Sequence, residues 1–347
     1  MNTNGNQPVE PTDLLRIVYT PNDIARLTLR TVEQRIENKG QGLRANIATL
    51  DAILMPFFPG ELIGIMGRPS NYKTGFMQFL ARQFVSQVGA SGKENEMVVY
   101  VTWEVSVEEL GFYDLAHMVQ LDAAQVWQGN VTEEALAKIR DAAMHRAAQP
   151  IWVIGHSLSR RRELRKLTLQ SVHDALLTVE THMDFHPRAI FLDYLQEIDP
   201  GEGQDRRERM INNVEAAKQL ARDCGCPVFM GVQAGRKVDE RTFKLPQIGD
   251  GEETSRLEQS ADKLIALWLP KNNLDIGDEL PDAGWSVTEN LLVLGLRKQR
   301  LGKSGQVLPL YVDAARNIIR PMDIHAVDLE PEGRRESAER DRSWKER

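Results

Sequence analysis

The sequence has few cysteines: Cys224 and Cys226 are the only two among 347 residues. Their spacing is too close for an ordinary disulfide, and two thiols cannot supply a Cys₄ zinc site. A zinc-ribbon module within this chain is therefore excluded. We interpret both cysteines as structural residues next to the strand that starts at Pro227, in a reducing compartment, and we predict a cytoplasmic protein.

Long apolar runs are also absent. No stretch approaches the roughly 20 apolar residues of a membrane-spanning helix. Residues 1–5, MNTNG, have neither the basic n-region nor the apolar h-region of an export signal. We therefore expect no membrane partner. The 41% hydrophobic content is ordinary for a globular protein, and 347 residues are enough for one large α/β domain with its own core.

An excess of basic residues is missing too, because the formal net charge is −7. This balance argues against a passive coat on nucleic acid, whose affinity comes from a broad basic surface. It does not argue against a ring, which needs positive charge only along its central channel.

A metal-binding cluster is not evident either. His182 and His186 stand four residues apart, the spacing of a two-histidine metal face on a helix. No third potential ligand lies nearby at a spacing that would complete a metal site, so we expect no metal there. We interpret the pair as polar residues at a helix end, just before Pro187.

What the sequence does contain is a phosphate-binding loop. Residues 64–74 read GIMGRPSNYKT and follow ELI, in which Leu62 and Ile63 are apolar. The order predicts a strand, a loop whose backbone N–H groups face phosphates, and a helix. Lys73 would contact the β- and γ-phosphates, and the Thr74 hydroxyl would ligate Mg²⁺. The predicted nucleotide-binding residues are Gly67, Arg68, Pro69, Ser70, Asn71, Tyr72, Lys73 and Thr74.

This loop departs from the pattern G-x-x-x-x-G-K-[ST] at one position, because Tyr72 replaces the second glycine. Glycine there tolerates backbone angles that cost other residues about 1 kcal/mol or more. The loop alone is therefore insufficient evidence for a nucleotide site.

Three predicted strands downstream each end in a polar residue. Apolar, β-branched runs precede Glu104, Asp193 and Gln233, and such runs are typical of strands buried on both faces of a parallel sheet. Ligands of doubly wound folds bind at the carboxyl ends of such strands. An acid at position 193 can hold the Mg²⁺ shell beside Thr74. Strand ends are often polar because they emerge into solvent, but the ordered set indicates a nucleoside triphosphatase.

These motifs resemble the RecA-like motor domain of bacterial hexameric replicative helicases of the DnaB type, over about residues 42–320. The loop at 67–74 is similar to A-R-P-S-x-G-K-T, and WEVS at 103–106 to L-E-M-S. FLDYLQ at 191–196 is similar to I-D-Y-L-Q, the most specific match. LEQSAD at 257–262 resembles I-E-Q-D-A-D. KQR at 298–300, with Gly302 and Gly305, resembles K-x-R-x-G-x-x-G.

The resemblance implies an α/β fold: a RecA-like P-loop NTPase with a mostly parallel, twisted sheet and helices on both faces. It also implies ATP and Mg²⁺ as ligands. Glu104 would polarise the attacking water and Gln233 would sense the γ-phosphate. Lys298 and Arg300 would contact the nucleotide of a neighbouring subunit in a homo-hexameric ring.

Two basic clusters follow the strands that end at Asp193 and Gln233. The resemblance implies that these loops face the channel and contact single-stranded DNA; the alternative is two solvated loops. The predicted DNA-binding residues are Arg206, Arg207, Arg209, Lys237 and Arg241.

The densest basic run, at residues 160–166, opens a predicted helix, where positive charge opposes the helix dipole. This favours a partner such as a neighbouring subunit, nucleic acid or phosphate. A solvent-exposed helix face, on which Glu163 partly offsets the positive charge, explains the run equally well.

We predict four regions along the chain: a disordered start at 1–11, a linker segment at 12–41, the motor at 42–320, and a charged, disordered tail at 321–347. The linker contains an amphipathic helix over 22–38. We expect it to dock on an adjacent subunit, and the alternative is packing on its own core. Too few residues precede the motor to encode the N-terminal helical domain of the resembled family, so we expect that domain to be absent.

Apolar periodicity predicts the remaining elements, with a polar surface loop at 272–284. Helices are expected at 74–86, 107–121, 133–146, 167–185 and 206–223, and strands at 97–103, 151–154, 189–192, 228–232, 264–269, 291–296 and 307–312.

Three functions remain open at this point. The first is a motor that hydrolyses ATP at subunit interfaces, translocates on single-stranded DNA and unwinds duplex, with a primase or loader as a further partner. The second is a recombinase or filament former, which the D-Y-L-Q and K-x-R motifs disfavour. The third is a non-translocating RecA-like ATPase that acts as a nucleotide-dependent assembly switch or scaffold.

Overall fold

The computed structural model describes residues 19–37, 42–159, 167–198, 206–251, 255–281, 283–322 and 327–328. Contacts divide the chain into two units, Met1–Gly42 and Leu43–Arg347. The first unit contains the helix α2 (Pro21–Glu37), close to the expected bounds. Its apolar side chains Ile24, Leu29 and Ile36 are 56%, 58% and 70% exposed.

The second unit is built on one sheet, whose strand order is β10-β8-β7-β6-β1-β5-β4-β2-β3, with β9 paired to β8. The neighbouring strands β6, β1, β5, β4, β2 and β3 pair in parallel. The pairings of β7 with β6 and of β8 with β7, β9 and β10 are antiparallel. The strands are β1 (Leu62–Gly67), β2 (Glu96–Thr102), β3 (Ile151–Ile154), β4 (His186–Asp193), β5 (Val228–Gln233), β6 (Lys263–Trp268), β7 (Leu291–Gln299), β8 (Gln306–Asp313), β9 (Ile318–Pro321) and β10 (Val327–Asp328).

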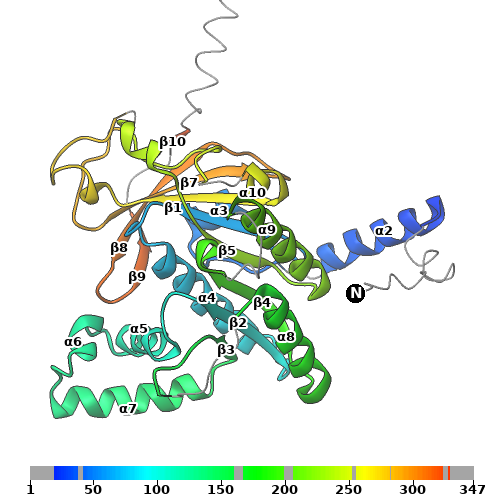
Figure 1. Ribbon diagram of the computed structural model, residues 1–347, viewed down its shortest axis with the longest axis horizontal. Coiled ribbons are helices and arrows are strands. Elements are labelled where there is room, and N and C mark those ends of the chain that lie inside the picture. Colours follow the sequence, from blue (N-terminus) through cyan, green and yellow to red (C-terminus); the bar gives the residue numbers. More distant parts are fainter. Residues whose placement is uncertain are drawn as a thin grey trace, which may run out of the picture. The chain divides into compact units, whose positions relative to one another are not determined.

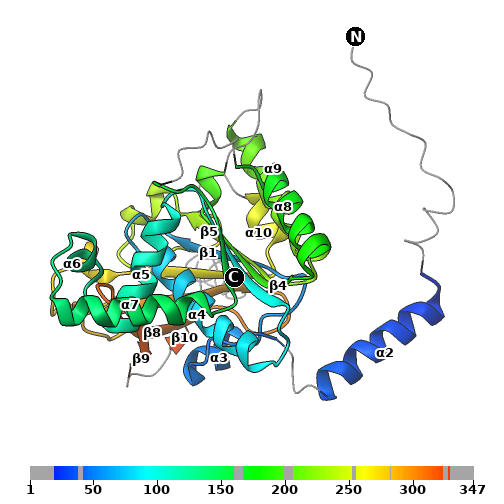
Figure 2. The same ribbon diagram turned by 90° about the horizontal axis from the view of Figure 1, so that it is seen from below.

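Helices cover both faces of this sheet (Figure 2). On one face, α3 (Ala48–Leu54) and α4 (Lys73–Ala90) bury side chains such as Leu50 and Phe84 in one apolar cluster. On the other face, α8 (Leu169–Met183) and α9 (Arg206–Asp223) bury side chains such as Leu176 in a second cluster. Residues of β1 and β2 are buried throughout because both their faces are covered. The predicted α/β fold with a mostly parallel sheet is confirmed.

A small helical cluster adjoins the β8–β9 turn (Figure 1). It consists of α5 (Val107–Val119), α6 (Ala123–Trp127) and α7 (Glu133–Ala147). Ser106 and Glu109 form a capping box that starts α5 shortly after β2, which ends at Thr102. The Ala123 N–H donates to the Ala315 carbonyl at 3.0 Å, which joins α6 to the β8–β9 turn.

The shorter elements differ most from the sequence predictions. Neither α3, with seven residues, nor α6, with five, was expected, because so few residues give little periodic signal. The strand β9 was also missed, and the sheet extends past the expected boundary at 320 through β10. A further short α-helix is α10 (Ser255–Ser260). The 3₁₀ turns are η1 (Leu195–Glu197), η2 (Arg236–Glu240) and η3 (Pro270–Asn272).

The interpretation of His186 as a residue at a helix end is wrong. Helix α8 ends at Met183, and Asp184 takes a left-handed conformation (φ 55°), so His186 begins β4. His182 and His186 therefore do not share a helical face. The basic run at 160–166 and the proposed disordered start at 1–11 lie outside the described residues. In the part of the chain that is described, no helix combines the length and apolarity needed to cross a membrane.

Candidate functional site

Strand register gathers the predicted polar ends at one edge of the sheet. Gly67, the last residue of β1, lies opposite Gln233 at the end of β5. Asp193 at the end of β4 lies opposite Thr102, two residues before Glu104. The phosphate loop, the two acids and the glutamine therefore meet where the parallel strands end, as a doubly wound sheet requires.

Side chains from distant segments hold the phosphate loop, which connects β1 to α4. The buried Asn71 accepts a hydrogen bond from the Leu269 N–H at 2.7 Å. Ser70, at a positive φ of 60°, has its carbonyl bound by the Asn272 side chain at 3.0 Å. These contacts anchor the loop to the end of β6 and to η3.

Tyr72 occupies the position of the missing glycine in a left-handed conformation, with φ 64° and ψ 24°. That conformation costs a non-glycine residue about 1–2 kcal/mol. The ring packs over Gly75, and the hydroxyl lies 2.5 Å from the side-chain amide of Asn317. Burial raises the pKa of Tyr72, so its hydroxyl stays protonated. Packing and hydrogen bonding thus accommodate the departure and leave the loop formed.

Lys73, the first residue of α4, turns back over the loop. Its Nζ donates to the carbonyls of Gly67 at 3.2 Å and Arg68 at 3.1 Å. Burial lowers the pKa of Lys73 to about 8, although the charges of Asp193 and Glu104 act in the opposite direction. The two carboxylates favour the charged form of Lys73, and a poorly solvated ammonium attracts an anion strongly.

Asp193 is 1% exposed, and Tyr100 Oη donates to its Oδ2 at 2.8 Å. Its Oδ1 has no hydrogen-bond partner among the described residues. Burial raises the pKa of Asp193, while Tyr100, Thr74 and Lys73 oppose that shift. An orphaned carboxylate oxygen beside the Thr74 hydroxyl is a donor set that suits Mg²⁺. Within the described ranges, no group of three or more His, Cys, Asp or Glu could hold a metal, so a cation here would share its ligands with substrate phosphates.

A cavity of about 460 Å³ opens at this edge. Burial, followed by the charge of Asp193, raises the pKa of Glu104. Gln233 is fixed by Gln196, whose Oε1 accepts from the Gln233 backbone N–H at 3.1 Å. The cavity is lined by Pro69, Ser70, Tyr72, Lys73, Thr74, Gly75, Gln78, Glu104, Val105, Tyr113, Tyr194, Gln233, Ala314 and Asn317.

Lys298 and Arg300 do not line this cavity. Lys298 Nζ donates to the Glu258 carbonyl at 2.5 Å. Arg300, 63% exposed at its side chain, pairs with Asp262 at 3.1 Å. Both residues lie at the β7–β8 end of the sheet, so the subunit alone does not bring its complete predicted catalytic set together.

The predicted DNA-binding residues lie beyond the ends of β4 and β5. Arg209 is on α9 and the exposed Lys237 is in η2. Arg241 contributes to the loop itself, since its guanidinium binds both carboxylate oxygens of Asp250 at 2.5 and 2.7 Å. The side chains of Arg206 and Arg207 lie outside the described part of the chain.

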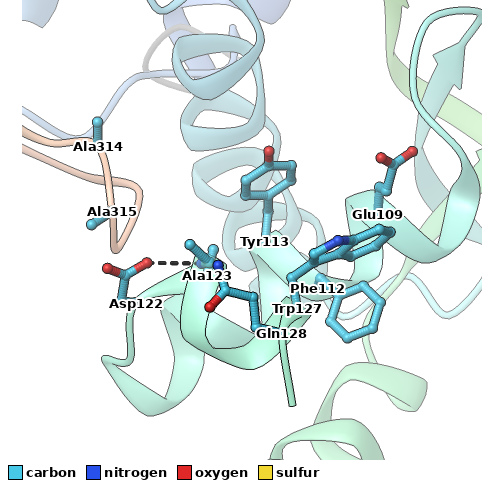
Figure 3. Close-up of a pocket in the computed structure, with 10 residues that line it drawn as sticks. Glu109, Phe112, Tyr113, Asp122, Ala123, Trp127, Gln128, Ala314 and Ala315 are labelled. Carbon is cyan, nitrogen blue, oxygen red and sulfur yellow. Dashed lines mark hydrogen bonds between the residues drawn. The ribbon is translucent and has the colours of Figure 1, made fainter. Parts of the chain in front are cut away.

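A second cavity, of about 390 Å³, adjoins the first and was missed by sequence reasoning (Figure 3). Tyr113 and Ala314 line both cavities. Phe112 and Trp127 make an edge-on ring contact with centroids 4.9 Å apart. The only sequence signal was the aromatic content of the segment after Glu104, and nothing local linked that segment to residues 314–315.

Residues 42–317 match the family described as DnaB-like helicase C-terminal domain. The chain belongs to this family. It is 26% identical over 294 residues to the replicative DNA helicase DnaC of Bacillus subtilis, covering 84% of this chain and 59% of the relative. It is 25% identical over 289 residues to the replicative DNA helicase DnaB of Geobacillus stearothermophilus, covering 82% and 58%. The chain thus spans somewhat more than half the length of these relatives.

Two solved structures confirm the fold of this DnaB-like domain. The ATPase domain of G40P superposes with a TM-score of 0.71 at 19% identity, covering 86% of this chain and 98% of that one. A DnaB-like replicative helicase, studied with its primase interactions, superposes with a TM-score of 0.69 at 19% identity, covering 85% and 66%. The RecA-like architecture expected from the sequence is therefore shown.

Proposed function

We propose that this chain is the motor of an ATP-dependent, replicative DNA helicase, which moves along single-stranded DNA and unwinds the duplex ahead. The main support is the convergence of Lys73, Thr74, Glu104 and Gln233 around one cavity, with the buried Asp193 beside them. Membership in the DnaB-like family agrees with this arrangement.

In the proposed reaction, loop N–H groups and Lys73 bind the β- and γ-phosphates of ATP. Thr74 and Asp193 would hold Mg²⁺, which would supply positive charge beside the phosphates. Glu104 accepts a proton from the attacking water, a role that contributes typically ~10²–10⁴ in rate. Gln233 would face the γ-phosphate, and Gln196 holds its backbone by accepting from the Gln233 N–H.

We place the nucleobase in the second cavity. It adjoins the phosphate site, because Tyr113 and Ala314 line both cavities. Its aromatic rings offer flat, apolar contacts, and Glu109, Asp122 and Gln128 offer polar ones (Figure 3). A base bound there would leave its triphosphate pointing towards Lys73.

The active form in this proposal is a homo-hexameric ring. Lys298 and Arg300 lie away from their own cavity, and the Arg300 side chain is exposed, so in this proposal both act on the nucleotide of a neighbour. An arginine supplied in this way is worth roughly 10³ or more in rate. The exposed apolar side chains of α2 support docking of that helix on an adjacent subunit.

Single-stranded DNA would run past the segments that follow β4 and β5. These strands are neighbours and parallel, so both segments leave the same edge of the sheet. Arg206, Arg207, Arg209 and Lys237 would bind DNA phosphates, while Arg241 would hold its loop through Asp250. A primase or loader is a further proposed partner, supported by the solved relative studied with primase.

The decisive experiment measures ATP turnover and strand displacement on a forked duplex, with Glu104→Gln as the inactive control. We expect Mg²⁺-ATP to be hydrolysed, single-stranded DNA to stimulate hydrolysis, and the stimulation to weaken as salt rises because phosphate contacts release counterions. Turnover no higher than in the control would contradict the proposal. An ATPase indifferent to DNA at low salt, without strand displacement, would instead favour the non-translocating switch or scaffold.

A further inference from the structure

Tyr72 is the residue at which this phosphate loop departs from the usual pattern, and it has a matched partner in Gly75. A Cβ added at Gly75 would lie 2.5 Å from two carbons of the Tyr72 ring. The ring thus fills the space that a side chain at position 75 would need. It forms part of the wall of the phosphate cavity.

The hydroxyl of Tyr72 extends this contact to the other end of the sequence. It lies 2.5 Å from the amide of Asn317, in the turn between β8 and β9. Asn317 is 3% exposed, and its side-chain amide also contacts Gln78 at 2.6 Å. Its backbone carbonyl accepts a hydrogen bond from the Arg82 guanidinium at 2.9 Å. This turn is therefore fixed to both the phosphate loop and the body of α4.

The same turn forms the boundary between the two cavities. Ala314 lines both, and Ala315 lines the aromatic one. Its far side is held by the helical cluster: Arg316 Nε donates to the Gln120 carbonyl at 3.1 Å, and the His117 ring lies 3.1 Å from the Arg316 carbonyl. A displacement of the turn would change the separation of the phosphate loop from the aromatic cavity.

We propose that Tyr72 is a positioning residue that, through Asn317, sets this separation and so makes the site select a nucleoside triphosphate over a bare polyphosphate. A ligand with base and phosphates must occupy both cavities at once, and it gains from the second contact only when the spacing matches its length. Inorganic tripolyphosphate occupies the phosphate loop alone and is insensitive to the spacing. This inference rests on the proposed ATP-binding function and on the placement of the base.

The test compares ATP and tripolyphosphate in wild type and Tyr72→Phe, which keeps the ring over Gly75 and removes the hydroxyl. We expect KM for ATP to rise about tenfold, kcat to stay within about twofold, and the inhibition constant of tripolyphosphate to stay unchanged. Asn317→Ala should produce the same selective loss. The double variant should lose no more than Asn317→Ala alone, since that substitution already removes the Tyr72–Asn317 hydrogen bond together with the contact to Gln78.

Melting temperatures separate misfolding from the proposed effect, and Tyr72→Phe alone decides the matter if Asn317→Ala does not fold. Equal weakening of ATP and tripolyphosphate by Tyr72→Phe would overturn the proposal, as would no change in either. A wild type that binds tripolyphosphate but not ATP, or that binds neither, would instead overturn the proposed function.

Discussion

Arg68 and Asp239 join the phosphate loop to the segment after β5 through a two-point ion pair. Arg68 Nη2 lies 2.9 Å from Asp239 Oδ2, and its Nε donates to Oδ1 at 3.2 Å. A third bond runs from Nη1 to the Ala234 carbonyl at 2.9 Å, directly after Gln233. The proposed phosphate-binding loop is thus connected to η2, where the proposed DNA contact Lys237 lies.

This connection predicts a route from DNA to the ATPase site. Asp239→Asn should keep basal ATP turnover and lose most of the stimulation by single-stranded DNA, because η2 would move without shifting Arg68. Stability should change by less than about 1 kcal/mol, since the pair is partly exposed. Stimulated and basal rates, measured side by side, check this. The matched control is Glu240→Gln, which removes the neighbouring carboxylate and should keep the stimulation. Equal stimulation in both variants would contradict a route from DNA to the ATPase site through Asp239.

The pKa of Lys73, about 8, predicts an alkaline limit on substrate capture. The Lys73 side chain attracts phosphate only while it is protonated, so kcat/KM for ATP should fall about tenfold from pH 7 to pH 9. The kcat at saturating ATP should fall less, because bound phosphates favour the charged form and raise the pKa. Initial rates across this range test the prediction, with melting curves to confirm that the protein stays folded. A flat kcat/KM profile would show that Lys73 does not limit capture.

Replacing Asp193 should weaken the use of Mg²⁺ by the ATPase without lowering the stability of the fold. Asp193→Asn should raise the Mg²⁺ concentration for half-maximal ATPase by at least about tenfold, because it removes the charged ligand. The free energy of unfolding should stay constant or rise by about 1 kcal/mol, since burial already disfavours the carboxylate. Mg²⁺ titration and denaturant unfolding measure both. Tyr100→Phe, which removes the hydrogen bond to Oδ2 but keeps the charge, should shift the Mg²⁺ requirement less; a larger shift would argue against Asp193 as a ligand.

The part of the site that could be predicted from sequence is the part fixed by local order. Lys73 follows a strand and a loop, Glu104 and Asp193 follow buried strands, and parallel pairing then brings strand ends together regardless of the detailed packing. The unpredicted part depends on contacts between remote segments. Tyr72 and Asn317 are 245 positions apart, and Arg68 and Asp239 are 171 apart. No periodic pattern or motif spacing records such contacts.

The fold shows the same division. Long elements such as α9 were predicted to the residue, because 18 residues give several turns of periodic signal. The segment at 272–284 was expected to be a polar surface loop, yet Leu280 within it is 1% exposed and packs with Trp268 of β6 in a third apolar cluster. Few apolar residues stand among many polar ones in this segment, so only the folded chain reveals which of them is buried.

Arg300 gives the sharpest test of assembly. Its guanidinium pairs with Asp262, which also binds Lys218 at 2.5 Å, so Arg300→Ala leaves Asp262 paired and should fold. We expect this variant to bind nucleotide nearly normally and to lose roughly 10³ in kcat. Lys303→Ala, which removes a second cation from the same turn, should keep most activity.

Mixing two inactive variants then shows whether Arg300 acts on its own nucleotide or on that of a neighbour. An Arg300→Ala subunit retains Glu104, and a Glu104→Gln subunit retains Arg300. If the arginine acts across the interface, about a quarter of the interfaces in rings mixed one to one combine both groups, because each subunit meets its neighbour head to tail. ATP turnover should therefore recover on mixing, although each variant alone is inactive. If Arg300 served its own subunit, every site would lack one group and no ratio of the two variants would restore activity.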